Sequence, residues 1–230
     1  MDLRVLTWNV AGGRAAPSAG RGVAGARRDP YAEFAAALDG WAWDVALLQE
    51  VPSWWPDRLR ATLVCEARQV LTSRSALLSL RRVLALRGPD MMGAAAGGAN
   101  AILARSDRII GENSLLLGRR PERRLVHGVA LACGVWISNL RVSDGPAAAD
   151  DLRAAVRAST RWARAARLPL ILGGDLALES PAGEGLQIVA SAGMQHVLCD
   201  AGIGARAESI ARPEHDALAG HPPLAVTLVI

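Results

Sequence analysis

The sequence predicts an α/β fold in which mixed β-sheets are covered by helices. Short apolar runs rich in branched residues, each ended by glycine or by polar residues, indicate buried strands. Some of these runs adjoin, as in a hairpin, and others are separated by helical segments, as in a crossover. The 230 residues are 51% hydrophobic and 21% charged, which allows a sizeable core and does not indicate disorder. We therefore expect residues 1–230 to form a single domain.

In the N-terminal half, the predicted strands alternate with helices and long loops. The predicted strands cover residues 3–10, 45–48, 65–71 and 100–104. Helices are expected over residues 31–38 and from about Ser53 onward, because apolar residues recur there at helical spacing. The segments 14–30 and 73–98 show no periodicity, and we interpret them as loops inside the domain.

The C-terminal half contains a hairpin signal and the clearest helix. Strands over residues 124–132 and 135–142 flank Cys133-Gly134, which is typical of a hairpin. The segment 147–166 has small and apolar residues on one face and arginines on the other, as in an amphipathic helix. The remaining predicted elements are a strand over 170–172, a short helix over 186–192 and strands over 196–199 and 224–230.

Charge and cysteine content limit the class of protein. All 26 basic residues are arginines, and the net charge of +4 allows an anionic partner without requiring one. The cysteines, Cys65, Cys133 and Cys199, are too scattered for a disulfide framework or a zinc site. We expect a cytoplasmic monomer with no secretory signal. No transmembrane segment is expected either, because no apolar stretch is long enough to span a bilayer.

Polar side chains stand where the predicted buried strands end, at Asn9, Glu50, Asp175 and His221. Strand ends are common places for functional sites because the sheet holds them rigidly. An amide, two carboxylates and an imidazole suit phosphoester chemistry, since Mg²⁺ takes one or two carboxylates and polarises a phosphoryl oxygen. Taken singly, each residue also has a plain structural interpretation, such as a turn role for Asp175 after two glycines.

Five sequence motifs follow one another through the chain. They are Leu3-Arg-Val-Leu-Thr-Trp-Asn-Val, Asp44-Val-Ala-Leu-Leu-Gln-Glu-Val, Gly98-Ala-Asn-Ala-Ile-Leu-Ala-Arg, Pro169-Leu-Ile-Leu-Gly-Gly-Asp-Leu-Ala and Gly220-His-Pro-Pro-Leu-Ala-Val-Thr-Leu. In order and spacing, the set resembles the endonuclease/exonuclease/phosphatase superfamily. The resemblance implies the deoxyribonuclease I-like fold, a two-sheet β-sandwich flanked by helices in four layers, α/β/β/α.

Carried over residue by residue, the resemblance implies a hydrolase of phosphoester bonds with Mg²⁺ or Mn²⁺ as its cofactor. Glu50 would be the principal metal ligand, and Asn9 would help to hold the metal or the phosphate. Asp175 would orient or deprotonate the attacking water, and His221 would contact the scissile phosphate. Asn100, on the central strand, would contribute to substrate binding.

Four positions depart from the family pattern. Arg141 stands where the family has a catalytic His, Ala177 where it has Asn, and Gln195 and Gly220 where it has Asp. Arg141 can bind phosphate with two hydrogen bonds but cannot donate a proton near neutral pH. We therefore predict Arg141 as a substrate-binding and catalytic residue. Since Gly220 offers no carboxylate, we expect the cation to be bound weakly.

Three functions stay open at this point, of which a nuclease acting on DNA has the least support, because it needs a basic groove and the net charge is only +4. The first is an active but divergent metal-dependent phosphoesterase, favoured because Glu50, Asp175 and His221 all survive. The second is a catalytically impaired relative, a pseudoenzyme that binds an anion or a protein. The expected partner is a phosphoester-containing small molecule or a lipid headgroup, and a nucleic acid has weaker support because the arginines are scattered. In each case Asn9, Glu50, Asp175 and His221 are predicted to converge at one end of the two sheets.

Overall fold

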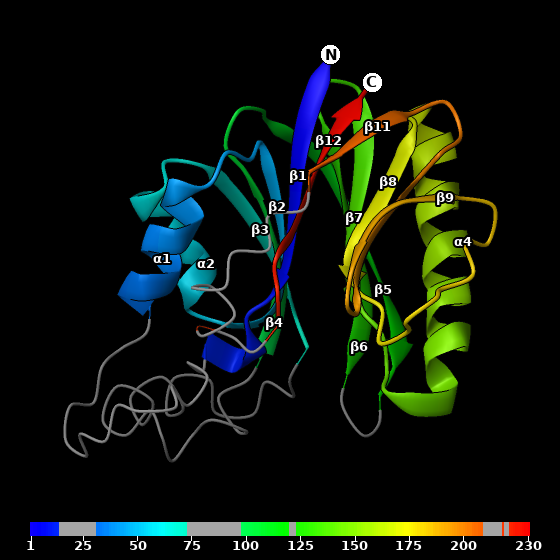
Figure 1. The fold of residues 1–230 in the computed structure, drawn as a ribbon, viewed down its shortest axis with the longest axis horizontal. Helices are drawn as coiled ribbons and strands as arrows, with labels where there is room; N and C mark the ends of the chain where they lie inside the picture. The colour runs from blue at the N-terminus through cyan, green and yellow to red at the C-terminus, as the bar shows by residue number, and fades with distance from the viewer. Residues whose placement is uncertain (14–30, 73–97, 120–122, 209–217, 219–220) are drawn as a thin grey trace.

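The computed structural model describes residues 1–13, 31–72, 98–119, 123–208, 218 and 221–230 (Figure 1). Within these residues, two six-stranded sheets pack face to face and helices cover their outer sides. The predicted loop 14–30, and all of the predicted loop 73–98 except Gly98, lie outside the described residues. The single-domain assignment of residues 1–230 stays a prediction.

The first sheet brings the two ends of the chain together. Its strands run in the order β11-β12-β1-β2-β4-β3. Their bounds are β1 (Asp2–Asn9), β2 (Val45–Pro52), β3 (Glu66–Leu71), β4 (Gly98–Ala104), β11 (Gly204–Glu208) and β12 (Leu224–Val229). Strand β1 pairs antiparallel with β12 and parallel with β2. Consequently β1 and β2 end at the same edge of this sheet.

The second sheet contains the other parallel pair. Its order is β5-β6-β7-β8-β10-β9. Its strands are β5 (Ile109–Gly118), β6 (Arg124–Leu131), β7 (Val135–Arg141), β8 (Leu170–Asp175), β9 (Gln187–Ala192) and β10 (Gln195–Cys199). The helix α4 (Ala148–Ala166) connects β7 to β8, which run parallel. As in the first sheet, two neighbouring strands therefore end side by side.

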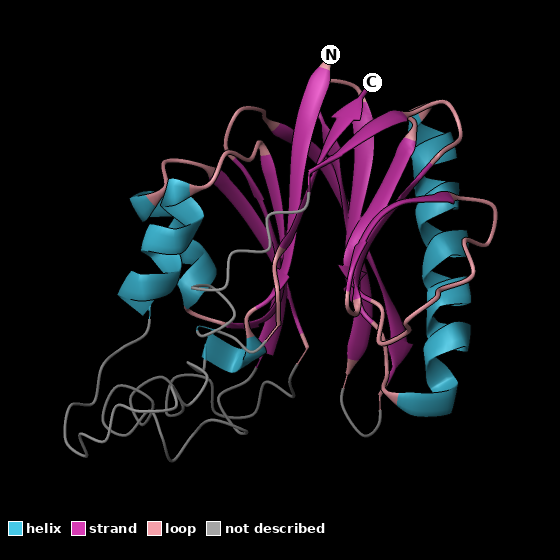
Figure 2. Ribbon diagram, viewed as in Figure 1, coloured by secondary structure: helices cyan, strands magenta, loops and turns pink. Residues whose placement is uncertain are grey.

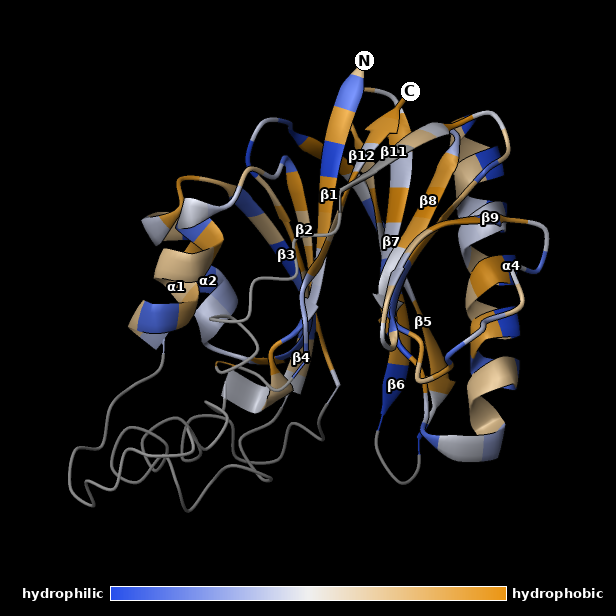
Figure 3. Cartoon of the chain, in the orientation of Figure 1, coloured by the Kyte–Doolittle hydropathy of each residue, from blue (hydrophilic) through white to orange (hydrophobic). Residues whose placement is uncertain are grey.

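Three apolar layers hold the sheets and helices together. Helices α1 (Tyr31–Gly40) and α2 (Trp55–Thr62) pack on the outer face of the first sheet through Trp8, Phe34 and Trp55. Aliphatic side chains such as Val5, Leu47 and Ile137 fill the space between the sheets. Helix α4 covers the outer face of the second sheet (Figure 2), and hydrophobic residues line the strands on both sides of the sandwich (Figure 3). These layers confirm the predicted four-layer α/β sandwich. Among the described residues, no helix has both the length and the apolar character needed to cross a bilayer.

Two regions differ from the sequence prediction. The predicted helix over residues 186–192 is wrong, because Gln187–Ala192 forms strand β9 and pairs with β10 around Gly193, which has a φ of +57°. A short apolar run does not separate helix from strand by periodicity alone, and the branched Ile188 and Val189 favour the strand. Strands β5 and β11 were not predicted. In β5 most side chains are exposed or half-buried, which weakens the hydrophobic signal.

Candidate functional site

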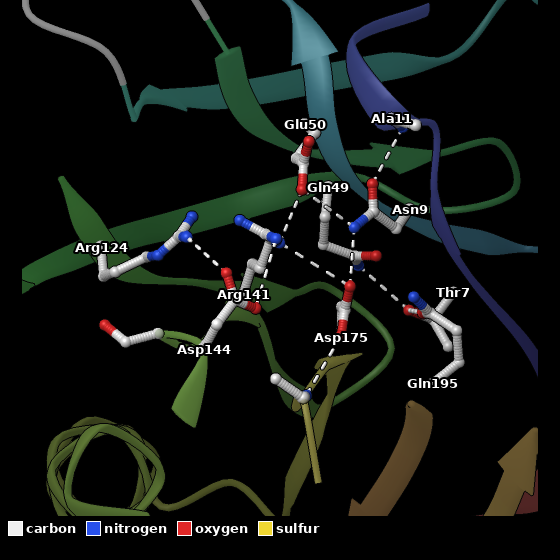
Figure 4. Close-up of polar contacts among 12 residues, drawn as sticks. Thr7, Asn9, Ala11, Gln49, Glu50, Arg124, Arg141, Asp144, Asp175 and Gln195 are labelled. Atoms are coloured by element: carbon white, nitrogen blue, oxygen red, sulfur yellow. Dashed lines mark hydrogen bonds and ion pairs between the residues drawn. The ribbon is translucent and has the colours of Figure 1, made fainter. Parts of the chain in front are cut away.

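The ends of four strands meet at one end of the sandwich. Asn9 ends β1 and lies in register with Gln49 of β2, next to Glu50. Arg141 ends β7 and lies in register with Asp175, the last residue of β8. Within each pair the strands are parallel and so end at the same edge of their sheet. Side chains of the two pairs meet across the sheets, through the contacts of Asn9 with Asp175 and of Arg141 with Glu50 (Figure 4).

Asn9 joins the predicted metal ligand Glu50 to the predicted catalytic residue Asp175. Its Nδ2 donates to Oε1 of Glu50 at 3.1 Å and to Oδ2 of Asp175 at 2.6 Å. Its Oδ1 accepts the backbone N–H of Ala11 at 2.9 Å, which fixes the orientation of the amide. Asn9 therefore turns a hydrogen-bond donor toward Glu50 and Asp175. To bind a metal beside these carboxylates, Asn9 would have to turn its amide oxygen toward them. The role of Asn9 as a metal ligand therefore stays a prediction.

A β-bulge directs Glu50 toward the second sheet. The register between β2 and β4 shifts between Leu48 and Val51, and Glu50 has a φ of +54°. In a regular strand, Gln49 and Glu50 would point to opposite faces. Here both reach the second sheet, where Gln49 contacts Asn139 and Glu50 contacts Arg141. Bulges and left-handed non-glycine residues occur often at functional sites, where they redirect a side chain.

The two glycines before Asp175 explain how β8 reaches its position. A Cβ on Gly173 would lie 2.7 Å from Cδ1 of Leu47 on the first sheet. Gly174 has a φ of +152°, and a Cβ there would overlap the carbonyl oxygen of Leu140. Only glycine allows β8 to approach both neighbours so closely. The Gly-Gly-Asp motif therefore sets the position of Asp175, whose Oδ1 also accepts the backbone N–H of Ala177 at 3.1 Å.

Charged side chains form a chain of ion pairs around Arg141. We call Glu50, Arg124, Arg141, Asp144 and Asp175 the charged cluster. The Nε of Arg141 lies 2.6 Å from Glu50 and 3.7 Å from Asp175, while its terminal nitrogen lies 3.6 Å from Asp144. Arg124 lies 3.8 Å from the same Asp144 carboxylate. Asp144 and Arg124 were not predicted as site residues, and the three-residue spacing between Arg141 and Asp144 was the available signal.

A second, neutral group of polar side chains links the interiors of the two sheets. We call Thr7, Gln49, Asn139 and Gln195 the amide cluster; all four are buried. Gln49 donates to Thr7 at 3.0 Å and to Asn139 at 2.9 Å, and Thr7 donates to Gln195 at 2.7 Å. Gln195, which replaces a family Asp, thus bonds to Thr7. The sequence signal that was overlooked is a neutral polar residue in each of these largely apolar strands.

The other two predicted site residues are less closely connected to this group. Asn100 is buried, and its Nδ2 donates across the sheets to the Leu125 carbonyl at 3.4 Å. The His221 carbonyl accepts the Trp8 indole N–H at 3.0 Å, which places it near the end of β1. Within the described residues, neither the Asn100 amide nor the His221 ring bonds to Asn9, Glu50 or Asp175. Gly220 lies outside the described residues.

A buried histidine, His196, lies beside the end of β8. Its Nε2 donates to the Leu178 carbonyl at 2.7 Å, and its Nδ1 lies 2.8 Å from the Ser191 hydroxyl. Burial lowers the pKa of His196, although the Leu178 carbonyl and the charge of Asp175 act in the opposite direction. Both ring nitrogens are engaged in the neutral form, so His196 is a structural residue of this region.

The donor set is compatible with a weakly held divalent cation. Among the residues that the structure describes, no group of three or more His, Cys, Asp and Glu side chains is arranged to hold a metal ion. Glu50 and Asp175 nevertheless come within hydrogen-bonding distance of one amide nitrogen, so two carboxylates lie close together. Mg²⁺ is commonly bound by one or two carboxylates, waters and substrate phosphate. The residues therefore fit Mg²⁺ or Mn²⁺ in the presence of a phosphorylated substrate.

The sequence and the fold were compared with those of known proteins. The sequence matches the model of the Endonuclease/Exonuclease/phosphatase family over residues 6–183. No curated protein matches the sequence. A structural neighbour from Beutenbergia cavernae DSM 12333, an endonuclease/exonuclease/phosphatase, has a TM-score of 0.71 at 20% identity and covers 100% of this chain and 72% of its own. At this identity the likeness shows the fold.

Two further structures share the fold. The human nocturnin catalytic domain with a bound sulfate anion has a TM-score of 0.69 at 14% identity, covering 99% of this chain and 94% of its own. A mannosyl-6-phosphatase from Bacteroides thetaiotaomicron VPI-5482 has a TM-score of 0.66 at 15% identity, covering 99% of this chain and 100% of its own.

Proposed function

The chain belongs to the endonuclease/exonuclease/phosphatase family, whose members are phosphoesterases, and we propose that it is a divergent metal-dependent phosphoesterase. One observation carries this proposal: a single buried amide, Asn9, binds both Glu50 and Asp175 from the ends of three strands in two sheets. A turn or a solvated strand end would not need this convergence. The arrangement supports two carboxylates that act on one substrate group.

The carboxylates have separate roles in this proposal. Glu50, with a side chain that is 33% exposed, would hold Mg²⁺ or Mn²⁺. When bound, the cation would polarise the phosphoryl oxygen and stabilise the charge of the leaving group. Asp175 is nearly buried and is held by Asn9 and by the Ala177 N–H. This fixed carboxylate would orient the attacking water and accept its proton.

Arg141 would bind the phosphate in place of the family's imidazole. A guanidinium matches the geometry of phosphate oxygens and keeps its charge, so it would stabilise the negative charge of the transition state. It cannot protonate a leaving group near neutral pH. We therefore expect turnover to be slow unless the leaving group departs without protonation. The roles of His221 at the scissile phosphate and of Asn100 in substrate binding stay predictions.

The proposed substrate is a phosphoester-containing small molecule or a lipid headgroup. The nocturnin structure contains a sulfate, and a second neighbour is a mannosyl-6-phosphatase, which supports an anionic group as the ligand of this fold. The net charge of +4 gives little support for a nucleic acid. The monomeric state and the cytoplasmic location stay predictions.

A second candidate function is an anion-binding relative without turnover. The ion pair of 2.6 Å between Arg141 and Glu50 favours it, because the principal predicted metal ligand is already neutralised by the chain itself. The two functions differ in one measurable property, the hydrolysis of a phosphoester by the protein with a divalent cation.

A hydrolysis assay tests the proposal. The full-length protein with Mg²⁺ or Mn²⁺ should hydrolyse p-nitrophenyl phosphate or bis(p-nitrophenyl) phosphate, and EDTA should stop the reaction. Glu50→Ala should lower kcat/KM by roughly 10²–10³-fold, since it removes the main ligand of the divalent cation, which would stabilise the transition state. Glu184→Ala, which removes an acid that pairs with Arg153 of α4, is the matched control and should keep the full rate. Hydrolysis that survives both EDTA and Glu50→Ala would contradict the proposal.

A further inference from the structure

The guanidinium of Arg141 lies against both carboxylates of the candidate site (Figure 4). Its Nε is 2.6 Å from Oε1 of Glu50 and 3.7 Å from Oδ2 of Asp175. Arginine stays protonated throughout the pH range in which proteins are folded. A permanent positive charge, carried by the chain itself, therefore occupies the place between the two carboxylates.

A divalent cation would need the same place. Mg²⁺ binds hard carboxylate oxygens, and Glu50 and Asp175 are the two that the strand ends bring together. A guanidinium that stays 2.6 Å from Glu50 would repel a cation bound to the same oxygen. Arg141 and a divalent cation are consequently competitors for the Glu50 carboxylate.

Arg141 has a further acidic neighbour to which it can turn. Its terminal nitrogen lies 3.6 Å from Oδ1 of Asp144, whose side chain is 73% exposed. The contact is longer than a hydrogen bond, so there is room for it to shorten. A guanidinium that leaves Glu50 would remain beside a carboxylate at a place that a dissolved anion can reach. One side chain with acidic partners on two sides, the Glu50–Asp175 pair and Asp144, can take two positions, and a cation and an anion would each favour one of them.

We propose that Arg141 is the resident counter-cation of Glu50, beside Asp175, and that it exchanges there with a divalent cation. On this view, which rests on the proposed function, the displaced Arg141 turns toward Asp144 and binds the substrate phosphate. Coupling between two ligands is reciprocal, so the phosphate strengthens cation binding by the same factor by which the cation strengthens phosphate binding. The site then takes up cation and phosphoester together, and it binds either one alone weakly.

Calorimetric titration of Mg²⁺ into the full-length protein tests the exchange. Sulfate serves as the anion, and chloride at equal ionic strength is its reference. In chloride, Arg141→Gln should bind Mg²⁺ about tenfold more tightly than the unchanged protein, within the roughly 5–150-fold range of such couplings. Sulfate should strengthen Mg²⁺ binding in the unchanged protein and have much less effect in Arg141→Gln. The matched control Arg153→Gln removes a guanidinium that is paired with Asp150 on α4, and it should behave like the unchanged protein.

A second measurement uses the unchanged protein and does not depend on the folding of a variant. Among the arginine Nε–Hε signals in the nuclear magnetic resonance spectrum, one should move when Mg²⁺ is added, and it should move further when sulfate is present. Side-chain resonance assignment of the isotope-labelled, unchanged protein identifies the Arg141 signal. Its response to both ions therefore decides the question even if Arg141→Gln does not fold.

Two results would overturn the inference. The first is a folded Arg141→Gln protein that binds Mg²⁺ no more tightly than the unchanged protein, including the case in which neither binds it. The second is a set of arginine Hε signals that Mg²⁺ leaves in place. Failure of the proposed function would look different, because the affinities would follow the expected order while no phosphoester was hydrolysed. That result supports the exchange and leaves the chain as an anion-binding relative.

Discussion

Neighbouring residues of the same strands enter two clusters of opposite character. In β1, Thr7 belongs to the amide cluster, and two residues later Asn9 joins the carboxylates. In β2, Gln49 belongs to the amide cluster and Glu50 to the charged cluster. The same change occurs along β7, between the buried amide of Asn139 and the guanidinium of Arg141. Within one or two residues, β2 and β7 pass from neutral, interlocked side chains to charged and partly exposed ones, while β1 passes to the buried amide of Asn9, which binds the carboxylates.

The two clusters differ in burial, and this difference separates the side chains that stabilise the fold from those that can bind a ligand. The amide cluster is buried, so each lost partner leaves a donor or acceptor that water cannot satisfy. In the charged cluster, the side chains of Glu50 and Asp144 are 33% and 73% exposed. Ion pairs to these exposed carboxylates contribute little to stability, because water competes for the charges. The side chains of Arg124, Arg141 and Asp175 are more buried, at 7%, 17% and 6% exposed. The charged cluster can therefore change partners at small cost to the fold only at Glu50 and Asp144.

The largest expected effect comes from Gly174, on whose backbone both clusters depend. Gly174→Ala would place a Cβ against the Leu140 carbonyl, in a backbone conformation that alanine rarely adopts. We expect the free energy of unfolding to fall by more than about 3 kcal/mol, since β8 must separate from β7. Urea unfolding followed by tryptophan fluorescence would measure this.

The matched control is Gly134→Ala. Gly134 also has a positive φ, +95°, but a Cβ there meets nothing within 4 Å. It reports the cost of the backbone conformation alone, about 1 kcal/mol. If the two variants lose equal stability, the close approach of β8 to β7 is not what requires glycine at position 174.

The next largest effect tests how much the amide cluster contributes to the free energy of unfolding. Asn139→Leu removes the acceptor of Gln49 and the donor to the carbonyls of Leu48 and Ala101. The groups left unpaired should lower the free energy of unfolding by about 2–3 kcal/mol. Asn113→Leu, on an exposed position of β5, is the control and should change it by less than about 0.5 kcal/mol. A loss as small in Asn139→Leu as in the control would mean that the amide cluster does not hold the sheets together.

The sequence predicts the components of the site better than their contacts. Buried strands and the residues at their ends follow from apolar runs and from the family motifs, so Asn9, Glu50 and Asp175 could be placed together. The pairing of Arg141 with Glu50 could not be predicted, because it joins β7 of one sheet to β2 of the other. It also depends on a bulge at Glu50 that shows only as a register shift.

Predictions fail where local pattern and long-range pairing disagree. The segment Gln187–Ala192 has the length of a helix fragment, yet the turn at Gly193 and pairing with β10 make it a strand. The family pattern shows that Gln195 stands at the place of an Asp, but it does not indicate which residue Gln195 contacts. Its contact with Thr7 depends on how the two sheets pack, and no spacing in the sequence encodes that.

The smallest predicted effect concerns the protonation of His196, whose buried imidazole is neutral in the folded protein. Burial lowers the pKa of its imidazole in the folded protein, so the unfolded chain takes up a proton first as the pH falls below about 6.5. The stability that the neutral ring contributes is therefore complete above that pH and declines below it, by at most about 1.4 kcal/mol per pH unit.

His196→Gln should lower stability near pH 7.5, because Gln cannot reproduce both contacts with Leu178 and Ser191, but it should flatten the decline between about pH 6.5 and 5.5. Urea unfolding at several pH values gives both quantities. A variant whose stability declines in parallel with that of the unchanged protein would show that the proton is taken up elsewhere, with His127, also buried and with a lowered pKa, as the next residue to replace.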